Sequence, residues 1–147
     1  MSSKNKLALA ARLGATAALA VGLAVSFQPS ASAAAAPAVS VSPASGLSDG
    51  QQVTVTATGL TPNTVFHLGH CAFVEPGKYG CDKTTAKDVV SDAQGKVNAT
   101  IVLHSSFDAV VTADGAVWGK VDAKTTPTQV GLGSASGEGG GQAVTFK

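Results

Sequence analysis

Several residue types that carry chemistry or recognition are scarce in this chain of 147 residues. It contains two cysteines, one tryptophan and one tyrosine, and its only arginine is Arg12. Residues 35–147 hold seven lysines against nine acidic residues, which gives a formal charge of −2. Proteins that bind DNA or RNA directly use a basic patch to neutralise phosphates and forked guanidinium groups to read bases. The composition therefore argues against direct contact with nucleic acid.

Motifs of catalysis are missing as well. The chain has no phosphate-binding loop, no His-Glu-x-x-His and no dinucleotide fingerprint. Its one Gly-x-Ser-x-Gly match, GLSDG at residues 46–50, falls in an expected turn between two strands, whereas a nucleophile elbow joins a strand to a helix. His104 and Ser105 are adjacent at the end of an expected strand, and neighbouring side chains of extended chain point apart. His67 and His70, next to Cys71, are three residues apart and should point to opposite faces of a strand. We predict no enzyme activity, no cofactor and no metal site.

The first 34 residues are typical of a secretory signal peptide. A positive start that includes Arg12 precedes an apolar, alanine-rich run, and residues 31–33 (Ala-Ser-Ala) offer small side chains for cleavage. A retained membrane anchor is the alternative, although Arg12 interrupts the apolar run. We therefore expect a secreted, monomeric domain of residues 35–147 without membrane attachment.

The two cysteines, Cys71 and Cys81, enclose a loop that contains Tyr79. In an exported chain they are expected to pair, and closing a loop of this size stabilises a fold by about 3 kcal/mol on a chain-entropy estimate. A free-thiol or metal-binding role is the alternative. Phe73 and Tyr79 flank the loop, so the bridge either fixes an aromatic wall of an apolar cleft or staples a small fold.

Apolar and polar residues alternate with period two over most of residues 39–147, which predicts half-buried β-strands. The expected strands are 39–43, 52–60, 64–73, 79–81, 89–90, 96–104, 116–123, 128–134 and 142–147. Glycine, proline, asparagine and aspartate separate them, and the aspartates there are expected in solvated turns. The pattern predicts an all-β antiparallel sandwich of immunoglobulin type.

Two further features of the pattern lead to local predictions. Trp118 is the one tryptophan of the chain and lies in the expected strand AVWGKVDA, and a lone tryptophan in such a strand is expected in the core. Residues 133–142 (GSASGEGGGQ) are rich in glycine and serine, which favours a flexible loop between the last two strands.

Residues 35–147 resemble the neocarzinostatin family of secreted apoproteins. The resemblance rests on the segments APAVSVSPASGLSDG, GHCAFVEPGKYGC, HSSFDA, ADGAVWGKVDA and TQVGLG. It implies a seven-stranded immunoglobulin-like sandwich or barrel with a small two-stranded ribbon. It also implies non-covalent binding and protection of a labile apolar chromophore, an enediyne antibiotic. The released chromophore damages DNA, so the protein would meet DNA only through it.

The resemblance also implies which residues bind the ligand. These positions are Phe73, Tyr79, Thr112, Gln129, Gly131 and Gly133. Ala86 stands where the family usually has an aromatic residue, which implies a wider and less aromatic cleft. Ala123 and Thr128 stand where the family has a second disulfide, so we expect a looser loop over residues 123–128. The alternative function is an extracellular structural or protein-interaction module that has lost the chromophore site.

Overall fold

The alternating segments of the sequence form ten β-strands. The computed structural model describes residues 36–111 and 115–147, and the regular structure within them is all β. The strands are β1 (Ala38–Ser42), β2 (Gln51–Thr58), β3 (Val65–Glu75), β4 (Lys78–Asp82), β5 (Lys87–Val90), β6 (Val97–Leu103), β7 (Ser106–Val111), β8 (Ala116–Asp122), β9 (Thr128–Gly133) and β10 (Gly139–Val144). The described residues contain no helix that is long and apolar enough to cross a membrane.

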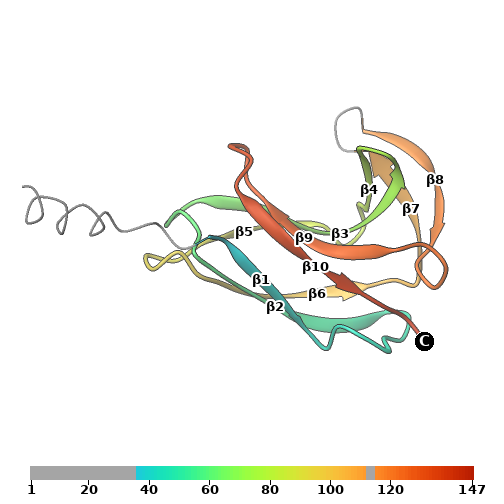
Figure 1. Cartoon of the computed structure of the whole chain (residues 1–147), viewed down its shortest axis with the longest axis horizontal. Helices are drawn as coiled ribbons and strands as arrows, with labels where there is room; N and C mark the ends of the chain where they lie inside the picture. Colours follow the sequence, from blue (N-terminus) through green and yellow to red (C-terminus); the bar gives the residue numbers. More distant parts are fainter. Residues whose placement is uncertain (1–35, 112–114) are drawn as a thin grey trace, which may run out of the picture. The chain divides into compact units, whose positions relative to one another are not determined.

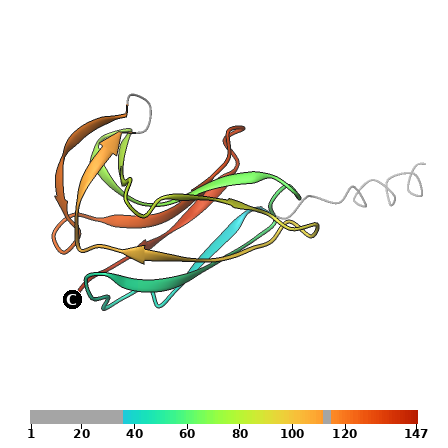
Figure 2. The ribbon, with the colours of Figure 1, turned by 180° about the vertical axis from the view of Figure 1, so that it is seen from behind.

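The strands form two antiparallel sheets that pack face to face (Figure 1). One sheet has the order β1-β2-β6, and the other has the order β10-β9-β3-β4-β7-β8, with β5 also paired to β3. Figure 2 shows the same two layers from behind, with β7 and β8 curving away from the sandwich as a ribbon. The predicted all-β antiparallel sandwich is confirmed.

The period-two pattern places one face of each sheet in the core. In β2, Val53, Val55 and Ala57 are buried while the threonines between them are exposed. β6 follows the same rule with Val97, Ile101 and Leu103 buried and Ala99 half-buried, as the sequence predicts. Fully burying an aliphatic side chain of this kind contributes about 1.5–3 kcal/mol. A shift of the strand pairing by one residue would move these side chains to the solvent face, so the alternation fixes the register of the sheets.

The apolar interior divides into two clusters. The larger one fills the space between the sheets and includes Phe66 and Leu68 of β3 and Val130 of β9. The smaller one, Ala72, Phe107, Ala109 and Val121, lies under the ribbon of β7 and β8. β3 contributes to both clusters, and its opposite face is therefore left for the surface described below.

Trp118 is not in the core, contrary to the prediction from the sequence. It is 45% exposed, and its indole Nε1 donates a hydrogen bond to Glu75 Oε1 at 3.0 Å. β8 buries Val121, and Trp118 lies three positions before it along the strand, so the two side chains are not expected on the same face. A register shift between β7 and β8 leaves Trp118 without a paired partner on β7. The side chain consequently lies at the surface.

Two other expectations about the strands were wrong. Residues 106–111 were not predicted as a strand, but they form β7, in which Phe107 and Ala109 are buried. The expected flexible loop over residues 133–142 is shorter, because residues 139–142 belong to β10 and pair with β9. The turn itself is closed by hydrogen bonds between Ser134 N and Glu138 O and between Gly137 N and Ser134 O. The glycines at 139–141 thus belong to a strand.

The positions of the absent second disulfide are buried. Ala123 and Thr128 are 6% and 3% exposed, and the Thr128 hydroxyl has no hydrogen-bond partner among the described residues. The turn between them is held at Asp122, whose carbonyl accepts hydrogen bonds from the amides of Thr125 and Thr126. The looser loop over residues 123–128 stays a prediction.

Candidate functional site

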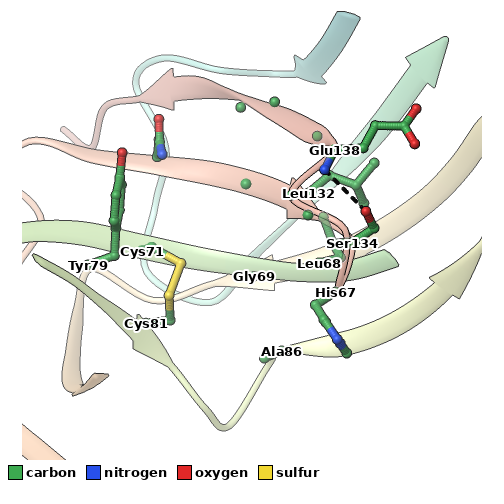
Figure 3. A pocket seen from close by; sticks show the side chains of 17 residues that line it. His67, Leu68, Gly69, Cys71, Tyr79, Cys81, Ala86, Leu132, Ser134 and Glu138 are labelled. Carbon is green, nitrogen blue, oxygen red and sulfur yellow. Dashed lines mark hydrogen bonds between the residues drawn. A yellow bond between two sulfur atoms is a disulfide. The ribbon is translucent and has the colours of Figure 1, made fainter. Parts of the chain in front are cut away.

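A cleft of about 680 Å³ opens on the outer face of the seven-stranded sheet beside the disulfide (Figure 3). Four adjacent strands supply most of its lining. These residues are Leu68, Gly69 and Cys71 of β3, Tyr79 and Cys81 of β4, Gln129, Gly131, Leu132 and Gly133 of β9, and Gly139, Gly140 and Gly141 of β10. His67, Ala86, Ser134, Gly137 and Glu138 complete it. The lining is mostly apolar, with few polar side chains.

β9 shows how the sequence divides its residues between core and cleft. Thr128, Val130 and Leu132 are buried against the interior, and the residues between them, Gln129, Gly131 and Gly133, are half-exposed. Successive side chains of a strand point to opposite faces, so the TQVGLG segment places its glutamine and glycines together on the cleft side.

The floor of the cleft is a row of glycines across three strands. Gly131 of β9 pairs in register with Gly69 of β3 on one side and with Gly141 of β10 on the other. A Cβ atom built on Gly131 would meet nothing within 4 Å. A Cβ on Gly69 would contact Cys71 Sγ at 3.7 Å and Ala86 Cβ at 3.8 Å. The hollow exists where side chains are missing at Gly131 and Gly69, whereas a Cβ on Gly141 would lie only 2.9 Å from Val130 O.

The wall beside the floor is the disulfide between Cys71 and Cys81. The two cysteines are register partners on β3 and β4, and the described residues contain no free cysteine. Gly80 lets β4 approach its other neighbour closely, since a Cβ there would lie 2.6 Å from Ala109 Cβ. The predicted pairing is confirmed, and the bridge holds β4 against the floor.

A buried carboxylate anchors the end of this wall. Asp82 follows Cys81 directly and accepts hydrogen bonds from Thr84 N at 2.9 Å, Thr84 Oγ1 at 2.6 Å and His104 Nδ1 at 2.9 Å. Burial raises the pKa of Asp82, but these hydrogen bonds outweigh burial and leave the pKa below its usual value. Asp82 therefore stays ionised near neutral pH and fixes the chain immediately after the disulfide.

An aromatic pair stands at the edge of the cleft. Phe73 and Tyr79 are register partners whose ring centroids are 4.5 Å apart. They are 49% and 43% exposed, so neither ring is packed into the interior. Tyr79 lines the cleft, whereas Phe73 is not among the lining residues and supports the Tyr79 ring from the side.

The structure brings together most of the positions singled out in the sequence. Tyr79, Gln129, Gly131 and Gly133 all line the cleft, and Phe73 contacts it through Tyr79. Thr112 lies outside the described residues. Ala86 also lines the cleft, so the described wall lacks an aromatic ring at that place.

His67 is a lining residue that the sequence analysis missed. The sequence pattern indicates it only as a candidate metal ligand beside His70, and the two histidines lie on opposite faces of β3, one exposed and one buried. His67 Nδ1 is hydrogen-bonded to Asp88 Oδ1 at 2.5 Å. The sequence could have indicated that His67 faces the cleft, because residues 67, 69, 71 and 73 share one face of a strand.

His70 lies directly beneath the cleft floor, between Gly69 and Cys71 in the chain. It is fully buried, its ring is 4.8 Å from that of Phe107 and 5.8 Å from that of Phe146, and neither ring nitrogen has a hydrogen-bond partner among the described residues. Burial lowers the pKa of His70 to about 4, despite an opposing effect of Asp82. The imidazole is therefore neutral at pH 7.

Metal binding finds no support in this geometry. Over residues 36–111 and 115–147 there is no group of three or more histidine, cysteine, aspartate or glutamate side chains placed to hold a metal ion. What the arrangement offers is an open, largely apolar surface with an aromatic edge and isolated hydrogen-bonding groups. Such surfaces bind apolar small molecules.

Comparison with known proteins gives consistent matches over the whole domain. The family model described as the Neocarzinostatin family matches residues 39–146. Macromomycin of Streptomyces macromomyceticus is 55% identical over 143 residues, which cover 97% of this chain and 98% of that protein. The antitumor antibiotic C-1027 apoprotein of Streptomyces globisporus is 37% identical over 146 residues, 99% of each chain.

Solved structures agree with the sequence matches. The structure of macromomycin superposes with a TM-score of 0.74 at 61% identity, covering 76% of this chain and 100% of the macromomycin chain. The solution structure of apokedarcidin gives a TM-score of 0.61 at 36% identity, covering 77% of this chain and all of its own.

Proposed function

The chain belongs to the neocarzinostatin family, and on that premise we propose that it is a secreted carrier of a small apolar chromophore. The chromophore binds non-covalently in the cleft beside Cys71–Cys81 and is an enediyne-type antibiotic. The protein shields this labile molecule, and the released molecule damages DNA. The protein itself is a monomer and has no enzyme activity.

The observation that carries this proposal is the glycine floor beside an aromatic edge. The cleft volume of about 680 Å³ falls within the range of small-molecule sites, about 300–1,000 Å³. The row of Gly69, Gly131 and Gly141 leaves a flat surface on which an extended apolar ligand can lie, and Tyr79 bounds it at one end. The disulfide and the register with Phe73 hold this edge in place, which lowers the entropic cost of binding.

The charge distribution supports indirect contact with DNA. Residues 35–147 contain no arginine and carry a formal charge of −2. A protein with this balance gains little from neutralising phosphates, so affinity for DNA has to come from the chromophore.

Secretion is supported by residues 1–34. Their positive start, apolar run and small residues are typical of a cleaved signal peptide. The solved macromomycin chain aligns over its full length with 76% of this chain, about the share that residues 35–147 represent. The disulfide also fits an oxidising compartment outside the cell.

Native mass spectrometry of the protein purified from the medium of its producing organism tests the proposal. The expected mass is that of a single chain without about 34 N-terminal residues, with one disulfide, plus a small molecule that dissociates under denaturing conditions. A chain that carries no small molecule from the medium and binds no aromatic probe in titration contradicts the carrier function. That result would favour an extracellular interaction module instead.

A further inference from the structure

His67 is the side chain that enters the cleft at the end away from Tyr79. In the register of the sheet, Gly139 of β10 pairs with Gly133 of β9, Gly133 pairs with His67 of β3, and His67 pairs with Asp88 of β5. A Cβ atom on Gly133 would meet nothing within 4 Å, so the position next to His67 on β9 is open. Figure 3 shows the ring at one end of the cleft.

Asp88 determines which ring nitrogen of His67 remains available. An ionised carboxylate only accepts hydrogen bonds, so the Nδ1 atom that lies 2.5 Å from Asp88 Oδ1 carries a proton. In the neutral imidazole the proton on Nδ1 leaves a lone pair on Nε2. Carboxylates orient metal-binding histidines in the same way, by accepting a hydrogen bond from the ring nitrogen that does not bind the metal.

Two other polar side chains at this end, Ser134 and Glu138, each hold a contact with the protein. Glu138 Oε1 accepts a hydrogen bond from Thr61 N at 2.7 Å, and Ser134 Oγ accepts one from Glu138 N at 3.2 Å. Within the described part of the chain, His67 Nε2 has no such partner. His67 Nε2 is therefore an open acceptor for a ligand group at this end, alongside the second carboxylate oxygen of Glu138.

We propose that His67 Nε2 accepts a hydrogen bond from a hydroxyl group on the ligand, and that the cleft thereby selects hydroxylated aromatic or polyketide ligands over their ethers. This inference rests on the proposed carrier function. His67 and Gly69 are two residues apart on β3, about 7 Å along a strand. A fused aromatic ring on the glycine floor can therefore reach His67 with a ring hydroxyl, and Asp88 acts as a positioning residue.

The test compares two probes that differ by one methyl group, 2-naphthol and 2-methoxynaphthalene. Affinities are measured at pH 7 with the protein exported from a full-length gene and purified from the medium. We expect the wild type to prefer 2-naphthol by about threefold to tenfold, the effect of one neutral hydrogen bond. His67→Phe keeps a ring of similar shape and should lose the preference. His67→Gln places an amide oxygen nearby and should retain part of it.

Asp88→Ala tests the positioning role with a spectroscopic measurement. Two-bond proton–nitrogen NMR spectra of the imidazole should show the proton on Nδ1 in the wild type. In Asp88→Ala the population should shift towards Nε2–H, with a smaller preference for 2-naphthol. An unchanged tautomer would overturn the role of Asp88.

The remaining outcomes separate the inference from the proposed function. Saturable binding of both probes with equal affinity, or a preference that survives in His67→Phe, overturns the role of His67 and leaves the carrier function intact. Failure of both probes to bind contradicts the carrier function and overturns this inference with it.

Discussion

Phe73 and Tyr79 face each other across β3 and β4, with ring centroids 4.5 Å apart and ring planes inclined by 47°. This tilted contact is a favourable geometry for an aromatic pair and is worth about 0.5–1.5 kcal/mol beyond area burial. Both rings remain exposed, and only Tyr79 lines the cleft. The pair therefore presents a pre-positioned ring at the edge of the site.

Removing the Tyr79 ring should weaken binding of an aromatic probe. We expect Tyr79→Ala to raise the dissociation constant for ethidium by about threefold to tenfold, the effect of one lost aromatic contact. Phe73→Ala should have a smaller effect, because Phe73 acts through Tyr79. Val117→Ala, on an exposed side chain that does not line the cleft, serves as the control in the same fluorescence titration. Equal affinities for all four proteins would contradict a contact with Tyr79.

Replacing both cysteines should affect stability and binding together. In Cys71→Ala/Cys81→Ala we expect the free energy of unfolding to fall by about 3 kcal/mol, because the unfolded chain is no longer constrained by the loop. Affinity for the probe should also fall, since the bridge holds β4 against the floor. Urea unfolding and a titration below the transition measure the two effects. Lower stability with unchanged affinity would mean that the bridge stabilises the fold but does not shape the cleft.

His70 should make the protein less stable as the pH falls from about 6.5 to about 4. The folded state keeps the pKa of His70 at about 4, compared with 6.5 for an unperturbed histidine. Between these values the unfolded chain binds a proton that the folded protein does not, so acidification favours unfolding. The full effect is about 3 kcal/mol and is complete near pH 4. Urea unfolding at several pH values measures it.

The control for this prediction is the pH slope of His70→Leu. The variant removes the titrating group and keeps an apolar side chain of comparable length between Phe107 and Phe146. Its free energy of unfolding should change less between pH 6.5 and pH 4.5 than that of the wild type, whatever its absolute stability. A slope equal to that of the wild type would show that other groups cause the pH dependence.

Removing either of two buried hydroxyl groups should change the free energy of unfolding, but in opposite directions. The Thr128 hydroxyl has no partner among the described residues, so Thr128→Val should stabilise the protein by about 1 kcal/mol. The Ser91 hydroxyl donates to Thr61 O at 2.6 Å and accepts from Thr64 N at 3.0 Å. Ser91→Ala should therefore destabilise the protein by about 1–3 kcal/mol. Thermal or urea unfolding checks both, and destabilisation by Thr128→Val would mean that its hydroxyl is hydrogen-bonded.

Much of the fold follows from the period-two pattern, because a strand with one buried face must alternate. β2 and β6 were predictable for this reason, and so was the division of β9 into core residues and the cleft residues Gln129 and Gly131. The turn roles of Asp92 and Asp122 also follow from residue type, since each carboxylate accepts backbone hydrogen bonds within its own turn.

Other features depend on packing that the pattern does not contain. Trp118 is hydrophobic, but its position in β8 relative to Val121 and the register shift place it outside. The glycines at 139–141 resemble a linker in composition, yet pairing with β9 makes them a strand. His67 lines the cleft, pairs in register with Gly133 and contacts Asp88, and both of these residues are distant from it in sequence.

The central claim is that the glycine floor is the ligand site, and Gly131→Leu tests it most directly. Gly131 is not among the glycines with positive φ, and its Cβ position is open, so a leucine should fill the cleft without straining β9. Thr56→Leu, at an exposed position of β2 in the other sheet, is the matched control. We predict that the dissociation constant for ethidium rises at least about tenfold in Gly131→Leu and is unchanged in Thr56→Leu, with both proteins folded. Saturable binding by Gly131→Leu with the affinity of the wild type would contradict the account.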